Sequence, residues 1–249
     1  MQVVAAGQTD TGRVRDHNED AFVVEDGLGL FVVADGMGGH AGGETASRLA
    51  VQSIVASVHS QLELLFAWEQ HPQGESPQAS ILAKAVQKSC ADVNCAAQVD
   101  PNLSGMGTTV AAAWVREGRA TIANVGDSRV YLCRDAYVML LTDDHSLVCE
   151  QMKAGVMSLE EAKNSRLKNI ITRSVGFEAD VAVDCYVLEP KPGDRLLICS
   201  DGMSNFVDLP EVGRVMHGFE LDQVPEKLIE LANERGGDDN ITVICIGVQ

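Results

Sequence analysis

Five short acidic segments, spread along the whole chain, carry side chains that could bind metal ions. They are residues 18–20, 34–40, 126–129, 200–202 and 237–240, which read NED, ADGMGGH, GDSR, SDG and GDDN. The middle three follow apolar runs that predict buried strands. Aspartate has low strand propensity and is rarely buried without a partner. Its repeated placement at strand ends therefore favours a hard divalent ion such as Mg²⁺ or Mn²⁺, which binds carboxylate and carbonyl oxygens. Turn capping by each aspartate is the alternative, and it explains one segment more easily than five.

Two of these segments place an aspartate directly before a glycine. A tight turn at Asp35-Gly36 would leave carboxylate oxygens free to bridge two ions, and Asp201-Gly202 repeats the pattern. Two divalent ions about 3.5–4 Å apart can clamp a phosphoryl group and acidify a water molecule. After Asp239, the side-chain amide of the next residue could anchor the loop.

Phosphate chemistry also needs a cation for the remaining phosphate oxygens. Arg13 and Arg15 stand just before segment 18–20, and the planar guanidinium fork suits phosphate. In an extended segment these two arginines would share one face.

Composition and charge limit the classes of partner. The chain has 249 residues, 45% of them hydrophobic, which is enough for one large domain or two small ones. Its net charge of −17 repels nucleic acid and anionic lipid, so we expect neither a nucleic-acid nor a membrane partner. The seven cysteines include no C-x-x-C pair, which predicts free thiols in a reducing compartment. The first residues lack a basic segment and no apolar run is long enough to span a membrane, so the predicted location is cytoplasmic.

Apolar periodicity divides the chain into two groups of strands with helices between them. Strands are predicted at 3–8, 21–25, 29–34, 108–115, 120–133, 137–141, 170–174, 181–188, 195–199 and 241–248. Helices are predicted at 44–58, 78–97 and 223–234, with a polar helical stretch at 146–168 that contains a capping box at Ser158–Glu161. This order indicates an α+β layered sandwich, in which many strand ends meet and can unite the carboxylates.

At this point the ordered motifs show a resemblance to a known family. The motifs RxxNED, VVADGMGGH, GxGTT, GDSR, DHSL, CSDG and GGxDN occur in the order seen in metal-dependent Ser/Thr protein phosphatases of type 2C, in their compact bacterial form. The resemblance covers the chain almost end to end. It implies one domain over residues 1–249, folded as a four-layer αββα sandwich of two antiparallel sheets flanked by helices. It also implies a mobile flap over the site at about 141–173.

The resemblance further implies the reaction and its partners. A binuclear Mg²⁺ or Mn²⁺ centre would activate a water molecule that attacks phosphorus directly, without a phosphoenzyme. The substrates would be proteins that carry phosphoserine or phosphothreonine. An opposing bacterial Ser/Thr kinase, in its autophosphorylated form, would be one of them.

The resemblance assigns the bridging and first-metal ligands by motif position. Asp35 would bridge both ions and Gly36 would contribute its carbonyl oxygen. Asp201 and Asp239 would hold the first ion.

The second metal and the phosphate are assigned in the same way. Glu19 and Asp20 would act at or near the second ion, partly through water. Arg15 would bind the substrate phosphate. Asp127, with Asp201, would match a third, weaker metal site of bacterial members.

Two positions depart from the wider family. Eukaryotic members often carry, directly after the bridging Asp-Gly, a histidine proposed as the general acid, and this chain has Met37 there. His40 is the nearest substitute, or else orders its glycine-rich loop. Asn205, four residues after Asp201, stands where relatives often have an acidic residue, which weakens the prediction of a third site.

Other functional classes fit the sequence less well. None of the seven cysteines has an arginine six residues later, as a thiol-based phosphatase needs, and no Gly-Lys pair forms a P-loop. Segment 36–41 fits the dinucleotide-binding pattern GxGxxA, but the carboxylate of Asp35 would repel a pyrophosphate. A non-catalytic, metal-stabilised domain that binds phosphoproteins remains as a different class, although such a domain would be expected to lose Asp35 or Arg15.

Overall fold

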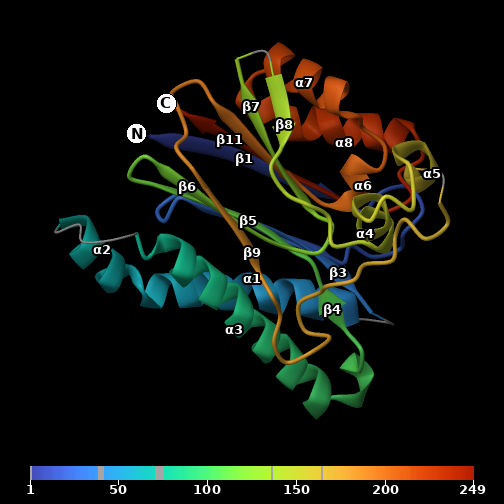
Figure 1. Cartoon of the computed structure of the whole chain (residues 1–249), viewed down its shortest axis with the longest axis horizontal. Coiled ribbons are helices and arrows are strands. Elements are labelled where there is room, and N and C mark those ends of the chain that lie inside the picture. Colours follow the sequence, from blue (N-terminus) through green and yellow to red (C-terminus); the bar gives the residue numbers. More distant parts are fainter. Residues whose placement is uncertain (1, 39–41, 71–75, 136, 164) are drawn as a thin grey trace.

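Two antiparallel sheets are stacked face to face between two layers of helices in the computed structural model, which describes residues 2–38, 42–70, 76–135, 137–163 and 165–249 (Figure 1). The first sheet has the strand order β1 (Val3–Asp10), β11 (Ile241–Val248), β10 (Arg195–Cys199), β7 (Arg129–Arg134) and β8 (Tyr137–Leu140). The second sheet has the order β2 (Asp20–Glu25), β3 (Leu30–Met37), β5 (Val110–Arg116), β6 (Arg119–Val125) and β9 (Asp184–Leu188), with β4 (Gly107–Thr108) paired to β3. The predicted four-layer αββα sandwich is confirmed.

Helices cover the outer face of each sheet (Figure 1). The second sheet is covered by α1 (Gly42–Ser60) and α3 (Gln78–Val99), and the first by α7 (Leu209–Gly218) and α8 (Val224–Glu234). The apolar residues of α1 recur every four positions, at Ala46, Ala50, Ile54 and Val58, and all are fully buried. A single helix face therefore provides the contact with the sheet.

The remaining helices are short. They are α2 (Leu62–Gln70), α4 (Leu147–Lys153), α5 (Leu159–Lys163), α6 (Asp201–Ser204) and the 3₁₀ turns η1 (Pro101–Leu103) and η2 (Leu221–Gln223). Among the described residues, no single helix has the length and apolar character to cross a membrane; α1 and α2 meet that test only as a pair bent by 42°.

A third apolar layer lies between the two sheets. Phe31 and Val33 of β3 pack there with Ile198 of β10 and Ile244 of β11. Because this layer locks the sheets together, the loops at one end of the sandwich have fixed positions relative to one another.

The chain passes from one sheet to the other between β6 and β7, so the single strand predicted at 120–133 is wrong. Gly126 has φ +101°, and a Cβ at this position would lie 2.6 Å from the Thr109 side chain. Only glycine accepts this backbone. The break puts Asp127 in the crossing between the sheets.

Other differences concern local elements. The strand predicted at 170–174 is reduced to an isolated bridge between Ile171 and Ser146. Helix α7 was not predicted, although Asp208 and Glu211 form a capping box at its start. The capping box at Ser158 is confirmed, with the Ser158 N–H donating to the Glu161 carboxylate at 2.8 Å.

Candidate active site

The acidic residues at the start of β2 and the end of β3 face each other across the second sheet. Asp20 pairs directly with Asp35 in the antiparallel register. The neighbouring Gly36 N–H donates to the Glu19 carbonyl at 3.2 Å, which makes 20–35 the non-hydrogen-bonded kind of pair, where side chains are closest. Like charges placed opposite each other destabilise a sheet. The pairing of these two aspartates therefore destabilises the sheet unless a cation compensates their charges.

Hydroxyl groups from the GxGTT motif hold the end of β3 that carries Asp35. The tight turn expected at Asp35-Gly36 is wrong, because β3 continues through both residues to Met37. The Asp35 N–H donates to Thr109 Oγ1 at 3.0 Å, and Thr108 Oγ1 donates to the Asp35 carbonyl at 2.9 Å. A Cβ on Gly36 would lie 2.1 Å from the Gly43 carbonyl oxygen. Glycine is required here by close packing, and the backbone at the end of β3 is fixed while the Asp35 carboxylate stays free of these bonds.

Asp201 begins α6 immediately after the last strand residue of β10 and Ser200. A Cβ on Gly202 would lie 2.0 Å from the Asn240 carbonyl oxygen. The acidic segments 200–202 and 237–240 therefore contact each other at Gly202, where only glycine fits. Asn205 donates its amide to Asp201 Oδ2 at 3.0 Å. The asparagine that departs from the acidic pattern thus supports a neighbouring carboxylate.

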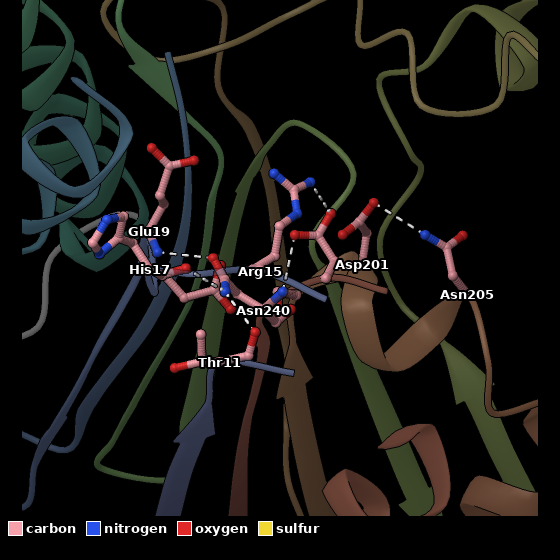
Figure 2. Close-up of polar contacts among 10 residues, drawn as sticks. Thr11, Arg15, His17, Glu19, Asp201, Asn205 and Asn240 are labelled. Carbon is pink, nitrogen blue, oxygen red and sulfur yellow. Dashed lines mark hydrogen bonds and ion pairs between the residues drawn. The ribbon is translucent and has the colours of Figure 1, made fainter. Parts of the chain in front are cut away.

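Asn240 joins the N-terminal and C-terminal parts of the site. Its Oδ1 accepts from the Glu19 N–H at 2.8 Å, and its Nδ2 donates to the carbonyls of Thr11 and His17, each at 2.9 Å. Figure 2 shows Asn240 beside Glu19 and Thr11. The predicted anchoring role of this amide is confirmed. It holds the N-terminal loop to the C-terminal one, across a separation of more than 220 residues in the sequence.

Burial and mutual repulsion raise the pKa values of the clustered carboxyl groups. Burial is the largest cause for each, followed for most of them by the charge of another carboxylate. The pKa of Asp20 and that of Asp127 rise to about 7, and the pKa of Asp35 rises well above its ordinary value. The charges around Asp35 come from Asp20, Asp201, Asp127 and Asp239. Each of these groups resists ionisation without a nearby cation.

The donors present fit hard divalent ions. One oxygen, Asp20 Oδ1, is buried without a hydrogen-bond partner among the described residues, and a buried, unpaired carboxylate oxygen is expensive. A cluster of carboxylates held this way matches the oxygen chemistry of Mg²⁺ and Mn²⁺. Within the described residues, no three His, Cys, Asp or Glu side chains stand in a ready-made ligand arrangement. The case for metal therefore comes from burial, charge and donor type.

A cation does reach this cluster from the N-terminal loop. Arg15 Nη2 lies 2.8 Å from Asp239 Oδ2, and both side chains are partly exposed. Figure 2 shows Arg15 between Asn240 and Asp201. Arg13 forms no ion pair with the described residues, and its N–H donates to the Gly237 carbonyl at 2.7 Å. The segment at Gly12–Val14 is a turn and not extended, so the expectation that both arginines share one face is wrong.

The structure brings Glu19, Asp20, Asp35, Asp127, Asp201 and Asp239 to one end of the sandwich. The start of the predicted flap is fixed beside them, because Arg129 pairs with Asp144 at 2.6 Å and the His145 N–H donates to the Gly126 carbonyl at 2.9 Å. His40 lies outside the described residues. Two contributors were not predicted, Thr108 and Thr109, although the GxGTT motif contains them.

Comparison with known proteins agrees with this geometry. The family model described as protein phosphatase 2C matches residues 9–235. A serine/threonine phosphatase of Listeria monocytogenes is 39% identical over 243 residues, which cover 96% of this chain and 93% of that protein.

Solved structures give the same result. The crystal structure of the Mycobacterium tuberculosis serine/threonine phosphatase PstP/Ppp is 31% identical, with TM-score 0.89 and full coverage of both chains. The catalytic domain of PstP in complex with two manganese ions, also 31% identical, has TM-score 0.84 and covers 98% of this chain and 97% of that one. The sequence match, the sandwich of sheets and the gathered carboxylates lead to one conclusion: this chain belongs to the protein phosphatase 2C family.

Proposed function

We propose that this chain hydrolyses phosphoserine and phosphothreonine in proteins with the help of divalent Mg²⁺ or Mn²⁺. The observation that carries the proposal is the gathering of buried carboxylates, one with an unpartnered oxygen, beside an arginine. Relatives of more than one genus that are named serine/threonine phosphatases support the substrate class.

The metal ions would supply a positive clamp for phosphoryl oxygens and the acidity that makes a water molecule nucleophilic. Asp35 is assigned to both ions, Gly36 would contribute its carbonyl oxygen, and Asp201 and Asp239 are assigned to the first ion. The chain's own part is to hold these donors rigid, which the hydroxyl groups around the Asp35 backbone support.

The remaining ligands are proposed at the edges of the cluster. Glu19 and Asp20 serve the second ion, partly through water, and Asp127 with Asp201 serves a third, weaker one. His40 remains a candidate for proton donation to the leaving group. We propose direct attack of water on phosphorus, without a phosphoenzyme.

The domain and cellular setting are proposals of the same kind. Residues 1–249 act as one phosphatase domain with a flap at about 141–173; pairing of β1 with β11 along their full length supports the single domain. All seven cysteines are free thiols, which supports a reducing cytoplasm. A Ser/Thr kinase with the opposite activity is the proposed physiological partner.

The test is hydrolysis of p-nitrophenyl phosphate and of a phosphothreonine peptide with Mn²⁺, with EDTA, and with Mn²⁺ restored after EDTA. We expect activity with Mn²⁺, none with EDTA, and recovery on restoration. Full turnover by the chelated sample would falsify the proposal, because the proposed reaction depends on a bound divalent ion.

Arg15→Ala should lower kcat/KM for the phosphopeptide by about one to two orders of magnitude, because losing a charged hydrogen bond costs about 1.5–3 kcal/mol. The loss should fall chiefly on KM, since Arg15 is assigned to bind phosphate in ground and transition states alike. Steady-state kinetics at saturating Mn²⁺ measures both constants.

Arg13→Ala is the matched control for this variant. Arg13 lies two residues away and is exposed. Its loss should act only through the long-range electrostatic field, so the fall in kcat/KM should be smaller than for Arg15→Ala. A larger effect from Arg13→Ala than from Arg15→Ala would show that the phosphate arginine has been assigned to the wrong position.

A further inference from the structure

The carboxylate of Asp20, in the second sheet, is held by hydroxyl groups of the first sheet. Thr242 Oγ1, on β11, donates to Asp20 Oδ2 at 2.6 Å. Ser200 Oγ, just after β10, donates to the same oxygen at 2.8 Å. Both hydroxyl residues are fully buried, so these bonds form where water does not compete.

Of these two residues, Thr242 belongs to a closed ring of hydrogen bonds. Asn18 Nδ2 donates to Thr9 Oγ1 at 2.8 Å, and Thr9 Oγ1 lies 2.7 Å from Thr242 Oγ1. Since the Thr242 proton is directed to Asp20, the proton between the two threonines comes from Thr9. The Asp20 N–H donates back to Asn18 Oδ1 at 3.1 Å and closes the ring.

This arrangement treats the two oxygens of Asp20 differently. Oδ2 takes both hydroxyl donors, whereas Oδ1 is buried and has no partner among the described residues. A neutral hydroxyl holds a carboxylate without cancelling its charge, unlike the arginine that pairs with Asp239. Once Asp20 is ionised, its full negative charge is thus kept, with a single oxygen left over.

We propose that Thr242 and Ser200 are positioning residues that fix Asp20 so that only Oδ1 is available to a divalent ion or to water bound by it. The inference rests on the metal site of the proposed function and adds the residues that orient it. Asp35 stands directly opposite Asp20, and repulsion would turn a freely rotating Asp20 away from the site. The hydroxyl pair holds it in place before metal arrives.

Thr242→Val is the sharpest variant, because valine keeps the branched shape and loses the donor. We expect Mn²⁺ to bind about 10- to 100-fold more weakly, the range found when partners that orient metal ligands are removed. Titration of the metal-free protein with Mn²⁺, followed by calorimetry, measures this affinity without an activity assay. Thr242→Ser restores the hydroxyl and should restore the affinity.

A matched control is available on another strand. Thr121, on β6, is equally buried, and its Oγ1 has no hydrogen-bond partner among the described residues. Thr121→Val should leave Mn²⁺ affinity unchanged. An equal loss of affinity in Thr121→Val and Thr242→Val would overturn the inference, because it would point to general loosening of the sheets.

A double variant with Asp20 separates the orientation of the Asp20 carboxylate from other effects of Thr242→Val. In an Asp20→Ala background, Thr242→Val should weaken Mn²⁺ binding no further. A full additional loss there, or unchanged affinity of Thr242→Val in the otherwise unaltered chain, contradicts the proposed role. If Thr242→Val does not fold, Ser200→Ala takes its place in the same comparison.

The same titration distinguishes this inference from the proposed function. Failure of the unaltered protein to bind Mn²⁺ would overturn the proposed function and the inference together. Mn²⁺ binding that is indifferent to both hydroxyl substitutions would overturn only the inference.

Discussion

Replacing Asp35 by asparagine is expected to lower kcat by several orders of magnitude at saturating Mn²⁺, while the protein keeps its fold. Asp35 is the most crowded carboxylate of the site, with charge effects from four other aspartates. Asparagine keeps the shape and removes the charge, so the donor assigned to both ions loses most of its attraction for them. Steady-state kinetics over a range of Mn²⁺ concentrations would separate lower kcat from weaker metal binding.

The same substitution should have the opposite effect on folding without metal. In EDTA, Asp35→Asn should raise the melting temperature, because repulsion with Asp20 and the other carboxylates disappears. The control is Asp26→Asn, an exposed aspartate in the turn at the far end of the same β2–β3 hairpin, which should change neither quantity. A kcat of Asp35→Asn close to that of the unaltered protein would remove Asp35 from its assigned role.

Local signals explain which parts of the fold could be predicted from the sequence. Strand β10 has the predicted bounds, since a run of large apolar residues ends sharply at the Ser-Asp-Gly segment, where α6 begins. The apolar face of α1 was predicted from its four-residue spacing. In both cases the pattern in a short window determines the element.

Non-local contacts explain what could not be predicted. The break at Gly126 depends on the Thr109 side chain, 17 residues away, and the crossing between sheets has no local mark beyond one glycine. The pair between Arg15 and Asp239 joins residues 224 positions apart. For the site, the motifs contain the acidic residues that the structure gathers, but they do not show which hydroxyl groups orient them. Thr242 belongs to none of the motifs, and its role depends on the stacking of the two sheets.

The last prediction concerns pH: the metal-free protein should lose stability as pH rises from about 5 to about 7.5. The pKa values of Asp20 and Asp127 are about 7 in the folded chain, against 3.8 for an ordinary aspartate. Between these two values the folded state binds more protons than the unfolded state, so stability falls with rising pH. Burial lowers the pKa of His145, which acts in the opposite sense near pH 6, but it is one group against several carboxyls.

Differential scanning calorimetry in EDTA across this pH range measures the effect. A shift of one pKa unit is worth about 1.4 kcal/mol, so a net change of a few kcal/mol is expected, equivalent to a fall in Tm of roughly 10 °C for a chain of this size. Asp127→Asn removes one titrating group and should reduce the slope of Tm against pH. Excess Mn²⁺ should weaken or reverse the trend, because ions bind the deprotonated carboxylates and displace the protons. A Tm that rises with pH in EDTA would mean that these carboxyls are already ionised in the folded chain, and the site would then have less need of a cation than its burial indicates.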